Sequence, residues 1–220
     1  EAGYKRYKIK VNPQTAVSYV EKIRIAYPEL PLMVDANSSF TLEHLDLLKQ
    51  LDAYNLMMIE QPLAHDDLLQ HRFLQSRLKT PICLDESITS VQMAINACEM
   101  ESAQILCVKM GRVGGWMATI QIHNYCRSKN VRLWCGGMIE FGISKAHNMA
   151  LATLEEFRIP GDISSSERFW YEDIILPEIN VENGRLVLSE EAGIGFDIHF
   201  PVLNRLTKLR EDYIFSRKTV

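Results

Sequence analysis

The chain lacks any long hydrophobic run and any basic stretch interleaved with aromatic residues. Its longest apolar stretches have the length of a strand, well short of the roughly 20 residues that cross a bilayer as a helix. The formal net charge is −4, so a nucleic-acid partner is not expected. No positively charged leader with an apolar core opens the chain, and we therefore expect a cytoplasmic protein with no membrane partner.

Cysteine is scarce and follows no metal-binding pattern. There are five cysteines and no C-x-x-C pair. Cys83, Cys107 and Cys135 fall in strand-like runs, where buried thiols pack as small apolar groups. We expect reduced, structural cysteines, and we favour disulfides or a thiolate metal site less.

What the chain does contain is a regular alternation of strand and helix patterns, with a hydrophobic content of 47% that can fill a large core. Strand-like runs end near residues 10, 35, 60, 85, 109, 135 and 162, and helical patterns cover residues 14–27, 41–54, 65–78, 90–100, 116–128 and 142–155. This order predicts an α/β fold, a (β/α)8 barrel of the TIM type. Because a closed barrel needs eight strands, we expect a barrel truncated at its N-terminus, with the first strand missing. The alternative is that the C-terminal segment supplies the eighth strand.

The pattern changes after residue 168. Residues 1–168 are expected to form barrel strands 2–8 with their helices. Residues 174–190 read as a hairpin with Asn183-Gly184 at its turn, and an amphipathic helix is expected around residues 201–215. Residues 169–220 are therefore predicted to be an antiparallel excursion and terminal helix that pack on something outside the barrel.

Five charged residues recur at the ends of the strand-like runs, with gaps of 25, 25, 25 and 24 residues: Lys10, Asp35, Glu60, Asp85 and Lys109. Parallel barrel strands end on one rim, where active sites of this architecture lie, so we expect these residues to share a pocket. Three carboxylates suit Mg²⁺, with Mn²⁺ as a substitute, whereas zinc would call for His or Cys. Each acid alone is more simply a solvated or capping residue. The three together favour a metal site, because packed like charges cost stability unless a cation neutralises them.

The two lysines lie on strands that flank the acids. A lysine acts as a general base only if its pKa is lowered, and Lys8, on the same strand face as Lys10, should disfavour protonation of Lys10. Arg112 could tune Lys109 in the same way or could bind an anion. The arrangement suits removal of a proton α to a substrate carboxylate by one lysine, with the metal stabilising the enediolate. The second lysine can return a proton or, in a dehydration, act electrostatically.

Two further polar residues follow the proposed ligands closely. Asn37 and Glu86 are expected to support the site by hydrogen bonding, although a purely structural role is equally open for Glu86. Positions two residues before the acids are Met33, Met58 and Cys83, which predicts an apolar layer below the rim.

Seven segments of the chain carry a family resemblance: YKIKV, VDANSSF, MIEQPL, CLDES, VKMGRVGG, WCGGMIEFGISKAHNMALATL and PGDISSSERFW. Through them the chain resembles the muconate-lactonizing-enzyme subgroup of the enolase superfamily, and in detail the o-succinylbenzoate synthase/N-acylamino acid racemase family. The resemblance implies that Mg²⁺ is bound by Asp35, Glu60 and Asp85 and that the acid/base pair is Lys10 and Lys109. It also implies that Lys8 and Asn37 support these residues. The residues implied to lie near the substrate are Gly136, Met138 and Ile139.

The resemblance also implies a reaction. The family dehydrates 2-succinyl-6-hydroxy-2,4-cyclohexadiene-1-carboxylate to o-succinylbenzoate for menaquinone biosynthesis, and some members racemise N-acylamino acids. A dedicated N-acylamino acid racemase or dipeptide epimerase is the alternative enzyme, and an inactive barrel fragment is the alternative of another class. Such enzymes carry an N-terminal α+β capping domain, which we expect to be missing here, and we therefore expect the 220-residue chain alone to be poorly active. The exposed edge of an unclosed barrel could also drive homo-oligomer formation.

Overall fold

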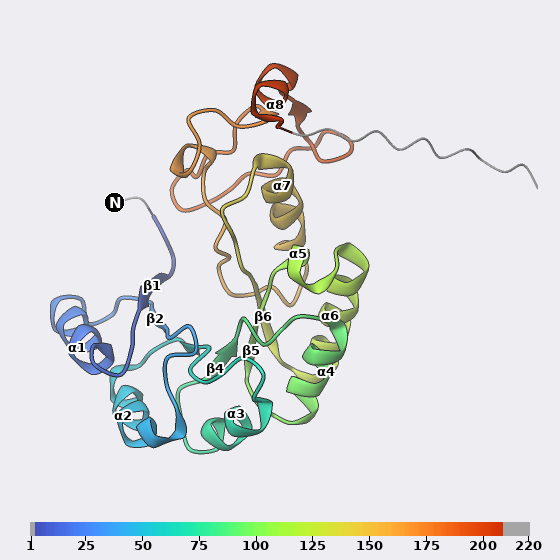
Figure 1. Ribbon diagram of the computed structural model, residues 1–220. Coiled ribbons are helices and arrows are strands. Elements are labelled where there is room, and N and C mark those ends of the chain that lie inside the picture. The colour runs from blue at the N-terminus through green and yellow to red at the C-terminus, as the bar shows by residue number, and fades with distance from the viewer. Residues whose placement is uncertain (1–2, 209–220) are drawn as a thin grey trace, which may run out of the picture.

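The computed structural model describes residues 3–208 and is built around one parallel sheet (Figure 1). Six strands pair in chain order: β1 (Tyr7–Lys10), β2 (Leu32–Asp35), β3 (Ile59–Glu60), β4 (Ile82–Leu84), β5 (Ile105–Val108) and β6 (Arg132–Cys135). The α-helices are α1 (Ala16–Ala26), α2 (Leu45–Gln50), α3 (Leu68–Gln75), α4 (Val91–Glu99), α5 (Met110–Val113), α6 (Trp116–Lys129), α7 (Gly142–Leu151) and α8 (Phe200–Leu206). Helices α1 to α6 surround the strands, whereas α7 and α8 extend from one end. The predicted α/β class and parallel barrel architecture are confirmed, with six strands of the barrel present in the described residues.

Side-chain alternation along the strands divides the interior into two apolar cores. On β5, Leu106 and Val108 join the core between sheet and helices, whereas Ile105 and Cys107 face the inside of the curved sheet. This inner core also contains Met33, Met58, Cys83, Trp134 and Ile159. The predicted apolar layer below the rim is therefore present, and it supports the strand ends from beneath.

Several helices differ from their predicted bounds for identifiable reasons. The segment 41–54 is not one helix, because 3₁₀ turns at Leu42–His44 and Leu51–Tyr54 flank α2, and Thr41 caps the first of them. Helix α3 begins at Leu68 rather than near His65, since the Asp67 carboxylate accepts a hydrogen bond from the Gln70 amide and sets the N-terminus.

The seventh predicted strand end, near residue 162, does not belong to an assigned strand. The chain there still follows β6, because the amides of Ile159 and Asp162 donate to the carbonyls of Leu133 and Cys135 at 3.5 and 2.9 Å. Pro160 interrupts this ladder, since proline has no amide hydrogen to donate.

The C-terminal segment pairs differently from the predicted hairpin. Strand β7 (Ile175–Leu176) pairs antiparallel with β8 (Asp197–Ile198), and the Asn183-Gly184 turn is closed by a single bridge between Glu182 and Arg185. Within residues 3–208 this segment adds no strand to the six-stranded sheet, so the alternative of an eighth strand from the C-terminus is wrong for that part of the chain. Helix α8 confirms the start of the predicted terminal helix, and the part beyond residue 208 lies outside the described residues.

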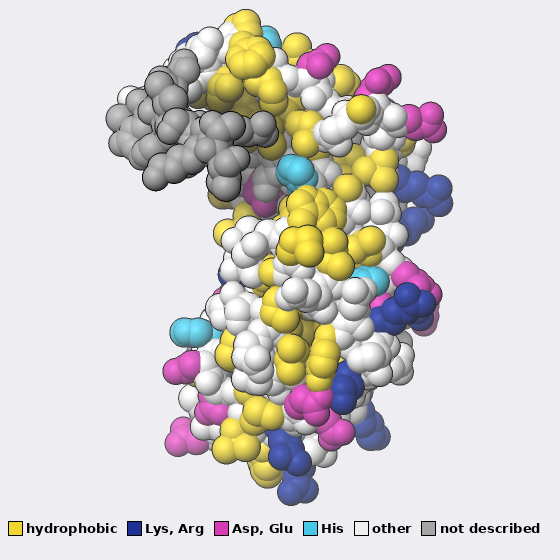
Figure 2. Space-filling model, turned by 90° about the vertical axis from the view of Figure 1, so that its right-hand side faces the viewer, with side chains coloured by type: hydrophobic (Ala, Val, Ile, Leu, Met, Phe, Trp, Pro, Cys, Tyr) yellow, Lys and Arg dark blue, Asp and Glu magenta, His cyan; other side chains and the backbone are white. Residues whose placement is uncertain are grey.

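Hydrophobic side chains gather along the middle of the face that carries α4 to α7, with charged side chains towards its edges (Figure 2). Met117 and Ile120 of α6 are among the exposed large hydrophobic residues, at 70% and 37% exposure. No helix in residues 3–208 is long and apolar enough to cross a membrane. Self-association remains a prediction.

Asp52 connects the segment after α2 to the segment before β4, and this contact gives a first test of the fold. Its two carboxylate oxygens accept hydrogen bonds from the amides of Lys79 and Thr80 at 3.0 and 2.8 Å. Burial alone would raise the pKa of Asp52, but these hydrogen bonds outweigh it and lower the pKa. We expect Asp52→Ala to reduce the free energy of unfolding by about 1 kcal/mol at neutral pH.

The difference in the free energy of unfolding between the wild-type chain and Asp52→Ala should depend on pH in a defined direction. A carboxyl group whose pKa is lower in the folded state stabilises the fold above its unfolded pKa of roughly 4 and loses this contribution as the pH falls through the folded pKa. Urea unfolding of both proteins at pH 7 and at roughly pH 2 measures it. Asp46→Ala is the matched control, because its carboxylate is 95% exposed and lies 3.7 Å from Lys49. An equal effect of the two substitutions would show that the Asp52 hydrogen bonds contribute nothing.

Candidate metal and acid-base site

Sheet register brings the five rim residues to one face. Lys10 is the direct partner of Asp35, and Asp35 is the direct partner of Glu60. The next strand is shifted by two residues, so that Glu60 lies opposite Cys83 rather than Asp85. Because side chains alternate with a period of two, this stagger keeps Asp85 and then Lys109 on the inner face.

Glu60 is the most unusual group of the site. Asp35, Glu60 and Asp85 are all buried, at 2%, 0% and 3% exposure. Within residues 3–208, neither carboxylate oxygen of Glu60 accepts a hydrogen bond, and Lys8 is its ion-pair partner at 3.4 Å. Burial raises the pKa of Glu60 to about 8, and the neighbouring acids Asp35 and Asp85 add to the rise while Lys8 opposes it. A buried acid that accepts no hydrogen bond, placed between two other acids, is a site where a cation would lower the free energy.

Lys8 lies beneath the first two acids. Its Nζ atom is 3.3 Å from Asp35 Oδ2, 3.4 Å from Glu60 Oε2 and 3.7 Å from Asp162 Oδ2. Burial would lower the pKa of Lys8, but the three carboxylates overcome this and raise it. Lys8 is therefore a fixed positive charge at neutral pH, in keeping with its expected supporting role.

Lys10 stands at the open side of the site, with 71% of its side chain exposed. Its Nζ atom is 3.2 Å from Asp35 Oδ2, the same oxygen that Lys8 contacts. It also donates to Asn37 Oδ1, while Asn37 Nδ2 donates to Glu86 Oε1 at 2.9 Å. The structure thus joins Lys10, Asn37 and Glu86 in one hydrogen-bonded chain that orients the lysine.

Lys109 and Arg112 hold the third acid from the other side. Lys109 Nζ lies 2.8 Å from Asp85 Oδ2, and Arg112 Nη2 lies 2.8 Å from Asp85 Oδ1. Burial favours a higher pKa for Asp85, but the two cations lower it. Burial lowers the pKa of Lys109, whereas the Asp85 carboxylate raises it through its charge and its hydrogen bond, and the net direction is upward. The structure therefore presents Lys109 as an ammonium group.

The predicted substrate neighbours divide into two groups. Gly136 lies against Lys109 and Cys107, where an added Cβ would be 2.4 Å from Cys107 Sγ and 2.9 Å from Lys109 Cε. Met138 and Ile139 are 59% and 69% exposed, in the segment between β6 and α7. Gly136 therefore lies at the lysine site. Contact of Met138 and Ile139 with a substrate remains a prediction.

Gln61 is a site residue that the sequence reasoning missed. It is fully buried with a positive φ of 39°. Its side-chain oxygen accepts hydrogen bonds from the amides of Asp85 and Ser87 at 3.0 and 3.2 Å, so the end of β3 fixes the backbone that carries Asp85. The periodic pattern of charged strand ends did not predict this contact, because Gln61 follows Glu60 directly and does not belong to that pattern.

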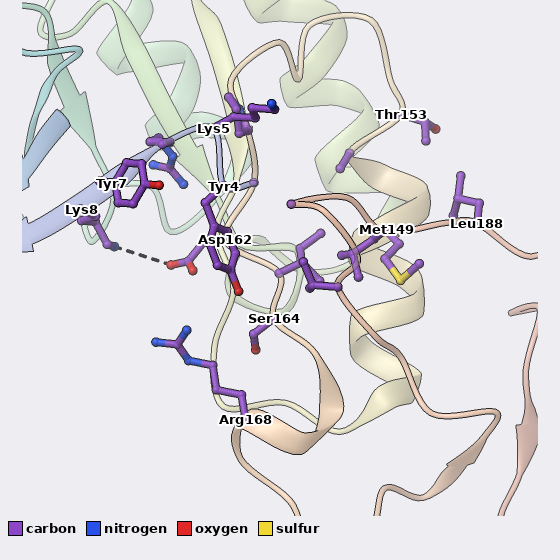
Figure 3. Close-up of a pocket in the computed structure, with 18 residues that line it drawn as sticks. Tyr4, Lys5, Tyr7, Lys8, Met149, Thr153, Asp162, Ser164, Arg168 and Leu188 are labelled. Carbon is purple, nitrogen blue, oxygen red and sulfur yellow. Dashed lines mark ion pairs between the residues drawn. The ribbon is translucent and has the colours of Figure 1, made fainter. Parts of the chain in front are cut away.

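Asp162 and Arg6 were also missed. Figure 3 shows Lys8 directed towards Asp162 across a pocket between the N-terminal strand and the segment after β6. The pocket has a volume of about 640 Å³, and Arg6 and Arg168 also line it. Arg6 stacks over the Trp134 ring at 4.0 Å. Its two-residue spacing from Lys8 could have placed Arg6 on the inner face, and Asp162 could have been found at the seventh predicted strand end.

The donor groups fit a hard divalent cation. Glu60, Asp85 and Cys107 bring one ligand atom each within 4.8 Å of one another, whereas Asp35 is engaged by two lysines. Burial raises the pKa of Cys107 well above its usual range, so this residue remains a thiol and contributes no thiolate. Carboxylate oxygens are therefore the ligands on offer, and they are the ligands that Mg²⁺ and Mn²⁺ accept.

The fold and the rim define a parallel α/β barrel protein with an acid cluster between two lysines. Residues 1–202 match the family described as enolase C-terminal domain-like, and the chain belongs to this family. It is 50% identical over 208 residues to the o-succinylbenzoate synthase of Bacillus subtilis (strain 168), covering 94% of this chain and 56% of that protein. It is 43% identical over 207 residues to the N-succinylamino acid racemase of Thermus thermophilus, with coverage of 94% and 56%.

Solved structures agree with the sequence relatives. A crystal structure of an enolase superfamily member from Listeria innocua superimposes with a TM-score of 0.91 at 44% identity, over 94% of this chain and 56% of that one. The chain thus spans little more than half the length of the relatives it matches. The superfamily assignment made from the motifs is confirmed.

Replacing Glu60 tests the cation site directly. We expect Glu60→Gln to weaken binding of Mg²⁺ or Mn²⁺ at least roughly tenfold, because it removes the one carboxylate of the three that accepts no hydrogen bond within residues 3–208. Glutamine has nearly the shape of the protonated acid, so the metal-free fold should be retained. Isothermal titration with Mg²⁺ and electron spin resonance with Mn²⁺ measure the affinity. The control is Glu43→Gln on an exposed 3₁₀ turn, and equal affinities of the two variants would disprove the site.

Proposed function

We propose that this chain is the metal-binding and acid–base part of an enzyme that removes a proton α to a carboxylate, of the o-succinylbenzoate synthase type. The observation that carries the proposal is the buried Glu60, which accepts no hydrogen bond within residues 3–208, between Asp35 and Asp85, with Lys10 on one outer acid and Lys109 on the other. The relatives named o-succinylbenzoate synthase support the same assignment.

In this proposal Asp35, Glu60 and Asp85 hold Mg²⁺. When bound, Mg²⁺ supplies positive charge that stabilises the enediolate of the substrate. Lys10 and Lys109 move the protons on the two faces of the α-carbon. Lys8 and Arg112 hold the acids in place, and the Asn37–Glu86 pair orients Lys10.

In a dehydration, one lysine removes the α-proton and then gives it to the departing hydroxyl group, which leaves as water. The C–H and C–O bonds break, a carbon–carbon double bond forms, and one water is released for each substrate molecule. The second lysine stays protonated and stabilises negative charge without transferring its proton.

N-acylamino acid racemisation is the second candidate, with dipeptide epimerisation as a related outcome. It is favoured by the two-sided placement of the amines, because racemisation needs removal of a proton on one face and its return on the other. Relatives named N-succinylamino acid racemase are 43% and 41% identical to this chain.

The deciding experiment offers the complete polypeptide both substrates, with Mg²⁺ and with a chelator. Formation of o-succinylbenzoate identifies the synthase, and exchange of the α-proton of an N-succinylamino acid in D₂O identifies the racemase. Both activities should disappear with the chelator. Turnover of neither substrate by a correctly folded, Mg²⁺-loaded protein would overturn the proposal.

We further propose that residues 1–168 are barrel strands 2–8 and that residues 169–220 pack on a capping domain. In support, β1 is an edge strand that pairs only with β2 within residues 3–208, and the pocket in Figure 3 lies on its open side. Exposed apolar residues of the tail, among them Tyr171, Val187 and Phe200, offer a surface for such a domain. The 220-residue chain alone is then expected to be poorly active, and full turnover by it would contradict this arrangement. Cytoplasmic location and homo-oligomer formation remain predictions.

A further inference from the structure

Two of the five cysteines are distant in the sequence but lie against each other in the structure, outside the rim. Cys98 near the end of α4 and Cys126 near the end of α6 have Sγ atoms 3.8 Å apart, within hydrogen-bonding distance for thiols. Both side chains are buried, at 7% and 0% exposure, and all five cysteines are free. An S–S bond is roughly 2 Å long, so the two sulfurs must move closer together to form one.

The two thiols differ in access. Cys98 lines a surface pocket of about 860 Å³, together with Arg72, Lys129 and Arg132, whereas Cys126 is not among the lining residues. A small polar oxidant can therefore reach Cys98 first. The hydrogen bond from Cys126 lowers the pKa of Cys98 and outweighs burial and the Glu99 carboxylate, which raise it. A thiolate at this position is the nucleophile of thiol oxidation.

We propose that Cys98 and Cys126 are a redox-modification site, in which Cys98 reacts with a peroxide and Cys126 resolves the product to a disulfide. The Cys98 thiolate attacks one peroxide oxygen, giving a sulfenic acid and releasing hydroxide, which takes up a proton to become water. The Cys126 sulfur then attacks the Cys98 sulfur and displaces its hydroxyl group as a second water. In total, two thiols and one hydrogen peroxide give one disulfide and two waters, and the two sulfurs supply the two electrons.

The disulfide would join α4 to α6 and enclose the chain between them. That loop includes β5, Lys109 and Arg112, so the crosslink would tie together the elements that carry one side of the rim. Closing the loop restricts the unfolded chain, and the melting temperature should rise by roughly 5 °C or more.

The test treats the full chain with hydrogen peroxide, alkylates the remaining thiols and maps tryptic peptides by mass spectrometry. We expect a linked pair of peptides containing Cys98 and Cys126, and a loss of two hydrogens from the intact mass. Lys109 and Arg112 lie between the two cysteines, so trypsin separates the peptides. The peptide of residues 80–109 also contains Cys83 and Cys107, and fragmentation of the linked pair in the mass spectrometer therefore has to place the link at Cys98. Reduction should reverse both the mass change and the rise in melting temperature.

Variants separate this site from general thiol oxidation. In Cys126→Ala, a dimedone adduct should accumulate on Cys98, because no second thiol resolves the sulfenic acid. Cys135→Ala is the matched control and should retain the Cys98–Cys126 link, since Cys135 lies on β6. Oxidation of Cys98 in the wild-type chain to the sulfinic acid with Cys126 still free, or oxidation of other cysteines while this pair stays reduced, would overturn the proposal. Both results are read from the wild-type chain and do not depend on a variant folding.

Discussion

Lys109→Ala is expected to lower kcat of the complete enzyme by roughly three orders of magnitude. Positioned proton-transfer groups contribute about 10²- to 10⁴-fold to catalysis, and Lys109 is the more enclosed of the two rim lysines, with 16% of its side chain exposed. Its contact with Asp85 at 2.8 Å fixes the amine beside the acid cluster. A substituted alanine retains neither the proton nor the positive charge.

Metal affinity distinguishes this loss from damage to the cation site. Lys109 and a bound cation compete for the same carboxylate oxygen of Asp85, so removal of the amine should leave Mg²⁺ affinity unchanged or increase it. A fall in kcat together with a fall in Mg²⁺ affinity would instead assign Lys109 a structural role. The control is Lys22→Ala on the exposed side of α1, which should retain full activity.

Comparison with Lys10→Ala shows which reaction the lysines perform. In a racemase each lysine serves one enantiomer, so each variant should lose α-proton exchange from one enantiomer while retaining some from the other. In a dehydration one lysine performs the proton removal, and the two variants should differ in their residual synthase activity. If both variants turned over either substrate at the wild-type rate, the assignment of these lysines as acid and base would fail.

The rim could be predicted from the sequence because its geometry is repetitive. One charged residue at each strand end, every 24 or 25 residues, suffices to place Lys10, Asp35 and Glu60 side by side when the strands are parallel. The alternating positions beneath them likewise predicted an inner apolar core that contains Met33 and Met58. Repeated strand–helix units, together with the alternation of side chains along each strand, leave few other arrangements of these residues.

The contacts that the sequence could not supply depend on register and on chain segments without a repeat. The two-residue stagger that places Glu60 opposite Cys83 has no sequence signal. The Gln61 contacts with the loop after β4 depend on a left-handed backbone conformation that is uncommon for glutamine. The pairing of β7 with β8 spans some twenty residues, whereas the turn signal at Asn183-Gly184 predicts only a local hairpin.

Gly136→Ala is expected to lower kcat about 100-fold without removing any catalytic group. Gly136 lies opposite the base of Lys109, where a Cβ atom would be 2.4 Å from Cys107 Sγ and 2.9–3.0 Å from Lys109 Cε and Cγ. Cys107 is fully buried in the inner core and cannot move aside without disturbing that packing. The backbone at Gly136 must therefore shift and the Lys109 side chain with it, and a displacement of about 1 Å at a reacting group can cost roughly 100-fold in rate.

Gly111→Ala is the matched control, because an added Cβ there meets no atom within 4 Å. It lies two residues after Lys109, so it probes the same segment without crowding the amine. Steady-state kinetics of both variants should show a fall in kcat for Gly136→Ala alone, with Mg²⁺ affinity preserved because none of the three atoms nearest the new methyl group belongs to a carboxylate. A Gly136→Ala enzyme with wild-type kcat would show that the position of Lys109 is not set by the space at Gly136, and the close packing of these two residues would then have no part in catalysis.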